Sequence, residues 1–105
     1  MSNPYDLSGK VVLVTGASQG LGKQFASTLS AHGAAVALAA RQIDKITALK
    51  EELESKGGKT CAIKMDVLNQ KSIMEGVETI ERELGSIDIL VNNAGLAINK
   101  LFLDV

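Results

Sequence analysis

The chain has 105 residues, of which 46% are hydrophobic and 22% charged, and its net charge is −1. These values are typical of a globular chain, and they exclude both a disordered segment and a strongly basic nucleic-acid-binding surface. The longest apolar run, residues 34–40, is too short to cross a bilayer, and residues 1–6 lack the basic-then-apolar pattern of a signal peptide. We therefore expect a single domain over residues 1–105, located in the cytoplasm, with neither a membrane nor a nucleic acid as partner.

The first part of the chain predicts a strand followed by a helix. Residues 11–14 are apolar and mostly β-branched, as in a buried strand. Leu21, Phe25 and Leu29 recur every four residues, so we expect them on the core face of a helix. Gly33 is expected to end that helix.

A second strand and helix follow. Residues 36–39 are rich in alanine, which predicts a strand that its neighbours approach closely. The next helix is predicted from an apolar stripe at helical spacing, formed by Ile43, Ile46, Leu49 and Leu53. Gly57 and Gly58 are expected to end it.

A third strand and helix lead into a fourth strand. Residues 61–65 predict a strand that contains Cys61, the only cysteine, which is expected to be a small core residue. A lone cysteine excludes an internal disulfide and a cysteine metal cage, and we predict no metal. The third helix is predicted from the inward-facing set Ile73, Val77, Ile80 and Leu84. Residues 87–91 then predict the fourth strand.

Strands separated by helices in this way imply right-handed crossovers and a parallel sheet with helices on both faces. The expected fold class is α/β, a Rossmann-type doubly wound parallel sheet with the strand order 3-2-1-4. The ligand crevice of such a sheet lies at the carboxyl ends of its first and fourth strands.

The connection between the first strand and the first helix is rich in glycine. It reads Thr-Gly-Ala-Ser-Gln-Gly-Leu-Gly over residues 15–22. A strand, a tight turn and a helix in this order direct free N–H groups and the positive end of the helix dipole at one point, which suits a phosphate. Gly16 would permit the turn, Gly20 the approach of a pyrophosphate, and Gly22 the packing of helix on strand. Ser18 can add a hydroxyl donor, although a tight turn can also use glycines for conformation alone.

A Walker A loop is excluded. Ala17 stands where that loop needs glycine, and Gln24 stands where it needs serine or threonine. The spacing also differs from the common G-x-G-x-x-G of dinucleotide sites, because it is G-x-x-x-G-x-G.

The motif T-G-x-x-x-G-x-G near the N-terminus resembles the cofactor loop of the short-chain dehydrogenase/reductase family. Two further motifs match in order and approximate distance, namely Asp66-Val67 after the third strand and Asn92-Asn93-Ala94-Gly95 after the fourth. The resemblance covers essentially the whole chain. It implies an oxidoreductase that transfers a hydride between a nicotinamide dinucleotide and a small-molecule carbonyl or alcohol substrate. It also implies a homo-oligomer, dimer or tetramer, for the parent enzyme.

The resemblance implies roles for individual residues. Asp66 would hold the adenine amino group, and the backbone of Val67 would line the ring pocket. Residues 93–95 would pass beside the adenosine ribose, while Asn92 would tie the fourth strand to the turn near Thr15. The residues alone also allow Asp66 to cap the following turn or helix. The implied cofactor-binding set is Gly16, Ser18, Gln19, Gly20, Leu21, Gly22, Arg41, Asp66, Val67, Asn93, Ala94 and Gly95.

The end of the second strand predicts the choice of cofactor. A site that prefers NAD places a carboxylate there, which accepts hydrogen bonds from the ribose 2′-hydroxyl and repels a 2′-phosphate. Ala40 and Arg41 stand there instead, so we predict NADP(H) in preference to NAD(H). A solvent-facing arginine without a role is the alternative. Gln19 also differs from the basic residue that NADP-using members often carry in the glycine loop.

No residue of this chain is predicted to be catalytic. The resemblance implies a tyrosine with a lysine four residues later, together with a serine and an asparagine. Tyr5 is the only tyrosine, and Gly9 stands four residues after it. We therefore expect the cofactor half of a longer enzyme, truncated before the catalytic half and inactive alone. The alternative is a freestanding nucleotide-binding or interaction module without catalysis.

Overall fold

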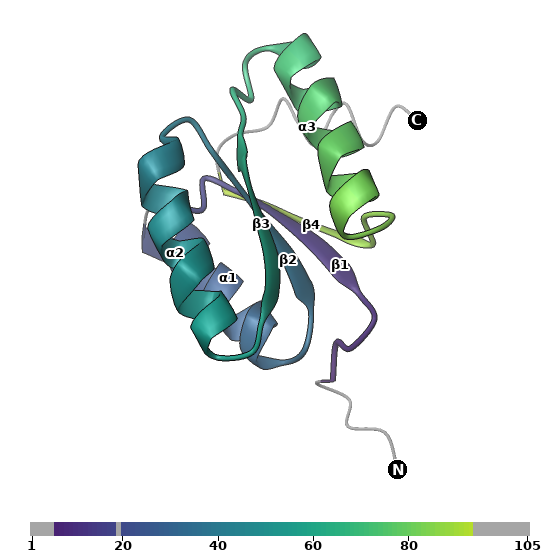
Figure 1. Ribbon diagram of the computed structural model, residues 1–105. Helices are drawn as coiled ribbons and strands as arrows, with labels where there is room; N and C mark the ends of the chain where they lie inside the picture. The colour runs from purple at the N-terminus through teal and green to yellow at the C-terminus, as the bar shows by residue number, and fades with distance from the viewer. Residues whose placement is uncertain (1–5, 19, 94–105) are drawn as a thin grey trace.

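The computed structural model describes residues 6–18 and 20–93, where strands and helices alternate along the chain (Figure 1). The elements are β1 (Val11–Thr15), α1 (Gly20–Ala31), β2 (Ala35–Ala40), α2 (Ile43–Ser55), β3 (Lys59–Lys64), α3 (Gln70–Glu83) and β4 (Ile89–Asn92). Neighbouring strands are parallel, and the sheet order is β3-β2-β1-β4. The predicted Rossmann-type α/β fold and its strand order are confirmed. No helix within the described ranges is long and apolar enough to cross a membrane.

Three strands begin at residues other than the predicted ones. β2 starts one residue earlier, at Ala35. β3 starts at Lys59, because the backbone there already pairs with β2 although the side chain is polar. β4 starts at Ile89 rather than at residue 87. The cause is Asp88, which donates its N–H to the Val11 carbonyl oxygen at 2.8 Å and accepts the Val11 N–H on Oδ2 at 2.9 Å. The Asp88 side chain thus takes the place of a backbone acceptor beside the first residue of β1.

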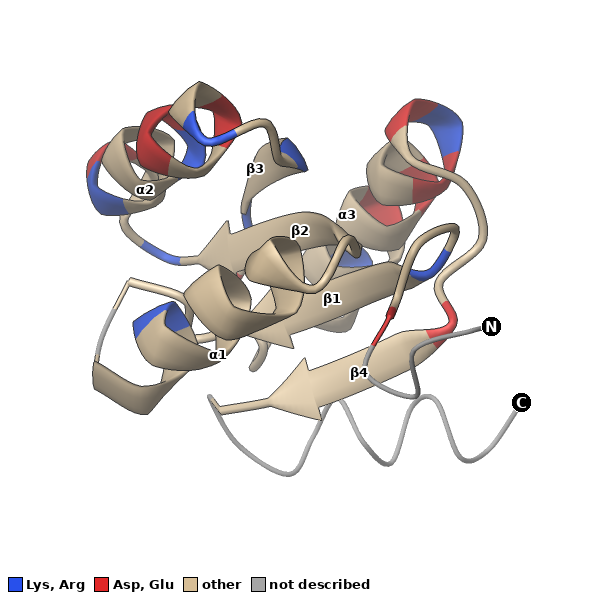
Figure 2. Ribbon diagram, turned by 90° about the horizontal axis from the view of Figure 1, so that it is seen from below, with Lys and Arg blue, Asp and Glu red and all other residues tan. Residues whose placement is uncertain are grey.

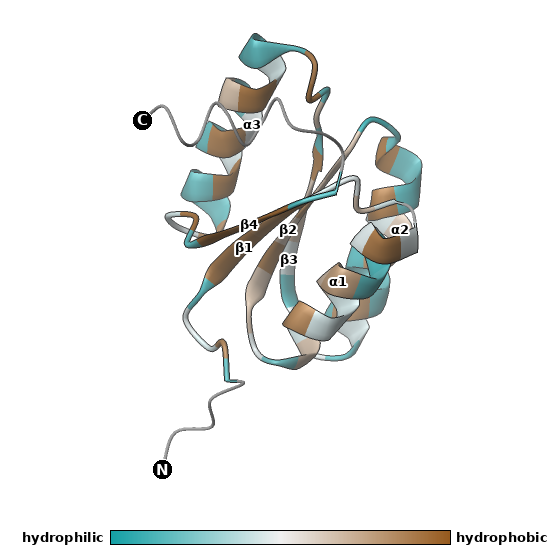
Figure 3. Cartoon of the chain, turned by 180° about the vertical axis from the view of Figure 1, so that it is seen from behind, coloured by the Kyte–Doolittle hydropathy of each residue, from teal (hydrophilic) through white to brown (hydrophobic). Residues whose placement is uncertain are grey.

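Helices cover both faces of the sheet, with α1 and α2 on one face and α3 on the other (Figure 1 and Figure 3). The central strands β1 and β2 are almost wholly buried, and apolar colouring runs along them in Figure 3. Charged residues gather instead on α2 and α3, as Figure 2 shows. The predicted apolar stripes of these two helices face the sheet, and their buried members are Ile46, Leu49, Leu53, Ile73 and Ile80.

The core face of α1 differs from the prediction. Leu21 and Phe25 are 60% and 41% exposed, so the expectation that they face the core is wrong. The buried residues of this helix are Gly22 and Ala26, with Leu29 half-buried beside them. The reason is steric, because a side chain on Gly22 would collide with the loop that follows β1. The helix therefore approaches the sheet through its smallest residues, and its large apolar residues lie to the side.

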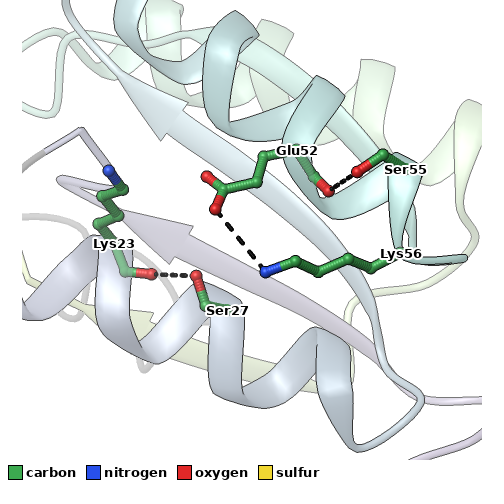
Figure 4. A network of polar contacts seen from close by, with 5 residues as sticks. All are labelled: Lys23, Ser27, Glu52, Ser55 and Lys56. Carbon is green, nitrogen blue, oxygen red and sulfur yellow. Dashed lines mark hydrogen bonds and ion pairs between the residues drawn. The ribbon is translucent and has the colours of Figure 1, made fainter.

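Polar contacts on the outer surfaces of α1 and α2 stay within each helix (Figure 4). On α1 the Ser27 hydroxyl donates to the Lys23 carbonyl oxygen at 3.0 Å. At the end of α2 the Ser55 hydroxyl donates to the Glu52 carbonyl oxygen at 2.6 Å, and Lys56 Nζ lies 3.7 Å from Glu52 Oε1. An exposed ion pair of this kind contributes at most about 1 kcal/mol. Apolar packing in the core that both helices share with the sheet, rather than these polar contacts, therefore holds the two helices in place.

Cys61 lies on β3 with its thiol on the face that α3 covers, and the predicted core position is confirmed. Burial in the apolar core, together with the nearby Glu83 carboxylate, raises the pKa of the Cys61 thiol from about 9 to about 12. At neutral pH the thiolate is therefore roughly a thousandfold scarcer than for an ordinary cysteine. Cys61 is accordingly a packing residue rather than a nucleophile.

The raised pKa of Cys61 predicts a stability loss at alkaline pH. Between pH 9 and pH 12 the unfolded chain loses the thiol proton while the folded chain keeps it, so the free energy of unfolding falls across this window. Below pH 9 the thiol is protonated in both states, and no such loss is expected. Urea unfolding of the wild type and of Cys61→Ala, each measured below and above pH 9, checks this. Equal pH slopes for the two proteins would contradict it.

Candidate functional site

The glycine-rich loop lies at the carboxyl end of β1 and leads directly into α1. Gly16 follows the strand with a φ of 64°, and Gly20 opens the helix with a φ of 37°. Both values fall in the left-handed region, which glycine adopts without steric cost. A β-carbon on Gly22 would overlap the carbonyl oxygen of Gly16 and lie 2.9 Å from Asn93 Nδ2. Glycine at these positions therefore lets the first turn of α1 approach the ends of β1 and β4.

A cavity of about 640 Å³ lies beside this loop. Its walls come from the segments that follow β1, β2, β3 and β4, so it lies at the carboxyl ends of all four strands. This is the edge at which ligands bind in parallel α/β sheets. The cavity brings together six of the predicted site residues, which are Gly16, Ser18, Arg41, Asp66, Val67 and Asn93.

The remaining predicted residues are placed differently. Gly20, Leu21 and Gly22 form the first turn of α1, next to the loop, but they are not among the described residues that line the cavity. More than half of the surface of Leu21 is exposed to solvent. Three predicted residues lie outside the described part of the chain, namely Gln19, Ala94 and Gly95.

Hydrogen bonds between β1 and β4 hold the floor of the site. The fully buried Thr15 hydroxyl donates to Asn92 Oδ1 at 2.9 Å and accepts the Asn93 N–H at 3.1 Å. Asn93 Nδ2 also donates to the Gly16 carbonyl oxygen at 3.4 Å. Asn92 therefore forms the structural link expected for it, and the end of β4 is fastened to the glycine loop.

Asp66 lies where β3 ends, and it is half-buried against the cavity. Its Oδ1 accepts the Leu68 N–H at 3.0 Å, and its carbonyl oxygen accepts the Asn69 N–H at 3.0 Å. Asp66 is therefore the turn residue that the sequence alone allowed. Among residues 6–18 and 20–93, however, no donor reaches its Oδ2. One carboxylate oxygen thus closes the turn while the other remains able to accept a hydrogen bond from a ligand.

The end of β2 presents a cation to the cavity. Arg41 follows Ala40, is exposed, and makes no hydrogen bond or ion pair with any other described residue. Gln42 stands at the N-cap of α2, but its side chain does not cap the helix. Asp44 in the first turn is not among the described residues that line the cavity. An anion beside Arg41 would therefore meet a free guanidinium, and it would stand near the positive end of the α2 dipole.

Besides Ala39, Ala40 and Met65 at the ends of β2 and β3, the cavity is lined by two residues that the sequence did not single out, Gln42 and Leu68. Leu68 is 81% exposed. The sequence does not indicate that these two residues line a site, because a glutamine before a helix and a leucine in a turn are common in many structural contexts. Their positions depend on how two loops fold beside each other.

Known proteins resemble this chain in sequence and in fold. Residues 10–105 match the family model described as short chain dehydrogenase. Over 98 residues the chain is 42% identical to gluconate 5-dehydrogenase from Gluconobacter oxydans (strain 621H). The aligned region covers 91% of this chain and 38% of that protein.

Two solved structures have a similar fold. One is a hydroxysteroid dehydrogenase from Escherichia coli, with a TM-score of 0.83, 33% identity, and coverage of 87% of this chain and 39% of that one. The other is L-sorbose reductase from Gluconobacter frateurii, complexed with NADPH and L-sorbose, with a TM-score of 0.82, 36% identity, and coverage of 87% and 35%. The chain thus spans less than half the length of these relatives. With its glycine loop, its sheet order and the family match over residues 10–105, it belongs to the short-chain dehydrogenase family.

Proposed function

We propose that this chain holds NADP(H) in the cavity at the strand ends and is the cofactor half of a longer oxidoreductase. That enzyme transfers a hydride between NADP(H) and a small-molecule carbonyl or alcohol. The observation that carries the proposal is the meeting of three chemically different groups in one cavity. These are the glycine loop at Gly16, the carboxylate of Asp66 and the guanidinium of Arg41.

The three groups match the parts of an adenosine dinucleotide. Gly16 lines the cavity, and the N–H groups at the start of α1 next to the glycine loop suit a pyrophosphate. The open Oδ2 of Asp66 suits an exocyclic amino group, which is a donor. The unpaired Arg41 suits a 2′-phosphate, and Ala40 before it contributes no carboxylate to repel one. When bound, the nicotinamide supplies the hydride, and the residues around the cavity bind and orient the adenosine end.

A relative supports the proposed cofactor, and the sheet supports the proposed longer enzyme. L-sorbose reductase from Gluconobacter frateurii, at 36% identity, was solved with NADPH. All four residues of β4 are only half-buried, as expected for a strand that a continuing sheet would cover. We therefore propose that the parent enzyme adds strands and helices beyond β4. From the sequence and the family resemblance we also propose that it acts in the cytoplasm and is a homo-oligomer.

The proposal predicts a sharp difference between this chain and the product of the complete reading frame. The longer protein should oxidise NADPH with at least one member of a panel of carbonyl compounds. The 105-residue chain alone should not, because it lacks the tyrosine and lysine that the family resemblance implies as general acid–base groups. General acid–base catalysis contributes a factor of roughly 10²–10⁴ to the reaction rate. Light scattering should also show the isolated chain self-associating through the edge of β4, which has no further strand beside it in the described sheet.

Two outcomes would overturn these statements. Turnover by a monomeric 105-residue chain would show that one of its own residues carries the chemistry, and that no catalytic half is needed. A complete protein that binds NADPH but oxidises it with no carbonyl compound would favour the non-catalytic binding module instead.

A further inference from the structure

The turn that carries Asp66 is closed by a ring of three hydrogen bonds. The Asp66 N–H donates to Ser72 Oγ at 3.0 Å. The Ser72 N–H donates to Asn69 Oδ1 at 3.1 Å, and the Asn69 N–H donates to the Asp66 carbonyl oxygen at 3.0 Å. Each residue of the ring therefore both donates and accepts. Ser72 belongs to the first turn of α3, so the ring fixes Asp66 relative to that helix.

Ser72 supplies an acceptor that the sheet cannot. Successive amides along a strand point to opposite sides. The Met65 N–H points towards β2, where it donates to the Ala40 carbonyl oxygen at 2.9 Å, so the Asp66 N–H points away from β2. β3 stands at the edge of the described sheet, and no strand is there to receive this N–H. The Ser72 hydroxyl, half-buried over the turn, accepts it instead.

Fixing the Asp66 backbone also orients its carboxylate. Oδ1 is held by the Leu68 N–H at 3.0 Å, so the position of Oδ2 follows from the backbone of the turn and from this one side-chain bond. Without the Ser72 hydroxyl, the Asp66 amide loses its partner, and only the bonds through Asn69 still tie the turn to α3. The carboxylate would then keep its charge and its bond to the Leu68 N–H, but its direction would be less firmly fixed.

We propose that Ser72 is a positioning residue that directs Asp66 Oδ2 at the 6-amino group of the purine, and so selects a 6-aminopurine over a 6-oxopurine dinucleotide. The proposal rests on the proposed function, because it assumes that the adenosine end of the cofactor occupies this cavity. A 6-oxo group is an acceptor, so it cannot bond to a carboxylate oxygen and is repelled by it. The discrimination between the two bases therefore reports how well Oδ2 is aimed.

The test compares the binding of NADPH with that of its hypoxanthine analogue, by calorimetry on the product of the complete reading frame. The wild type should bind NADPH roughly 10- to 150-fold more tightly, the range of one hydrogen bond to a charged group. Ser72→Ala should reduce this ratio by roughly 3- to 10-fold. Ser72→Thr keeps the hydroxyl and should restore the ratio.

The control removes a hydroxyl elsewhere on the same helix. Thr79 Oγ1 donates to the Glu75 carbonyl oxygen at 3.0 Å, away from the turn, so Thr79→Ala should leave the ratio unchanged. Thermal unfolding of each variant shows that it is folded. A Ser72→Ala protein that loses affinity for both dinucleotides equally would overturn the positioning role and leave the proposed function standing. A wild type that binds neither dinucleotide, or binds both equally well, would overturn the adenine site itself.

Discussion

Replacing Arg41 with alanine in the product of the complete reading frame should weaken NADPH binding by roughly 10- to 150-fold. The binding of NADH should stay nearly unchanged. The guanidinium lies on the cavity wall with no partner among the described residues, so its charge-assisted hydrogen bonds would go to the 2′-phosphate. NADH has a hydroxyl at that position and loses little. Calorimetric titration of both cofactors measures the two changes directly.

Lys56→Ala serves as the matched control for Arg41→Ala. It also removes one positive charge, but at the far end of α2, where Lys56 pairs with Glu52. If Arg41 acted only through the net charge of the protein, both variants would weaken NADPH binding alike. Equal losses of NADPH and NADH affinity in Arg41→Ala would show that the residue is structural, and the prediction would be wrong.

A second large effect is expected for Asp66→Asn. The asparagine oxygen can still accept the Leu68 N–H, so the turn should persist. An NH₂ group then replaces Oδ2, and it faces the adenine amino group donor to donor. NADPH affinity should fall by roughly 10- to 150-fold. The hypoxanthine analogue of NADPH should bind better than it does to the wild type, because its 6-oxo group accepts from the new donor.

The affinities of Asp66→Asn for NADPH and for its hypoxanthine analogue distinguish two roles of Asp66, namely recognition of the base and formation of the turn. Asp66→Ala removes both the turn acceptor and the ligand acceptor, so it should weaken the binding of NADPH and abolish the preference for NADPH over the hypoxanthine analogue. An Asp66→Asn protein that keeps the wild-type preference for NADPH would show that the carboxylate serves the turn alone. The notion of an adenine-reading aspartate would then have to be abandoned for this chain.

Much of the fold follows from the alternation of apolar strands with amphipathic segments, because parallel strands joined by helices have few allowed connections. The stripe of α2 was predicted correctly because Ile46, Leu49 and Leu53 are large and regularly spaced. The core face of α1 was not predicted correctly. The four-residue spacing indicates its large apolar residues, whereas the close packing of the helix at Gly22 places small residues against the sheet. The start of β4 was missed because Asp88 completes the ladder with a side chain, which no apolar pattern reveals.

The candidate site shows the same division between motif and geometry. Gly16, Arg41 and Asp66 could be predicted from the sequence because each stands at a strand end, where a doubly wound sheet gathers its ligand groups. Ser72 could not be singled out. Its role depends on the edge position of β3 and on the direction of a single N–H, and both are known only once the strands are in register.

The bond between Thr15 and Asn92 has a consequence for how the protein forms. It joins residues 77 positions apart, so the neighbours of β1 in space are distant in sequence. Long-range pairings of this kind form slowly, because a large loop must close before they contribute stability. During synthesis β1 gains β2 early, but it waits for β4 until almost the whole described chain has left the ribosome. The bonds from Asn93 to Thr15 and Gly16 can consequently form only after β4 has been synthesised.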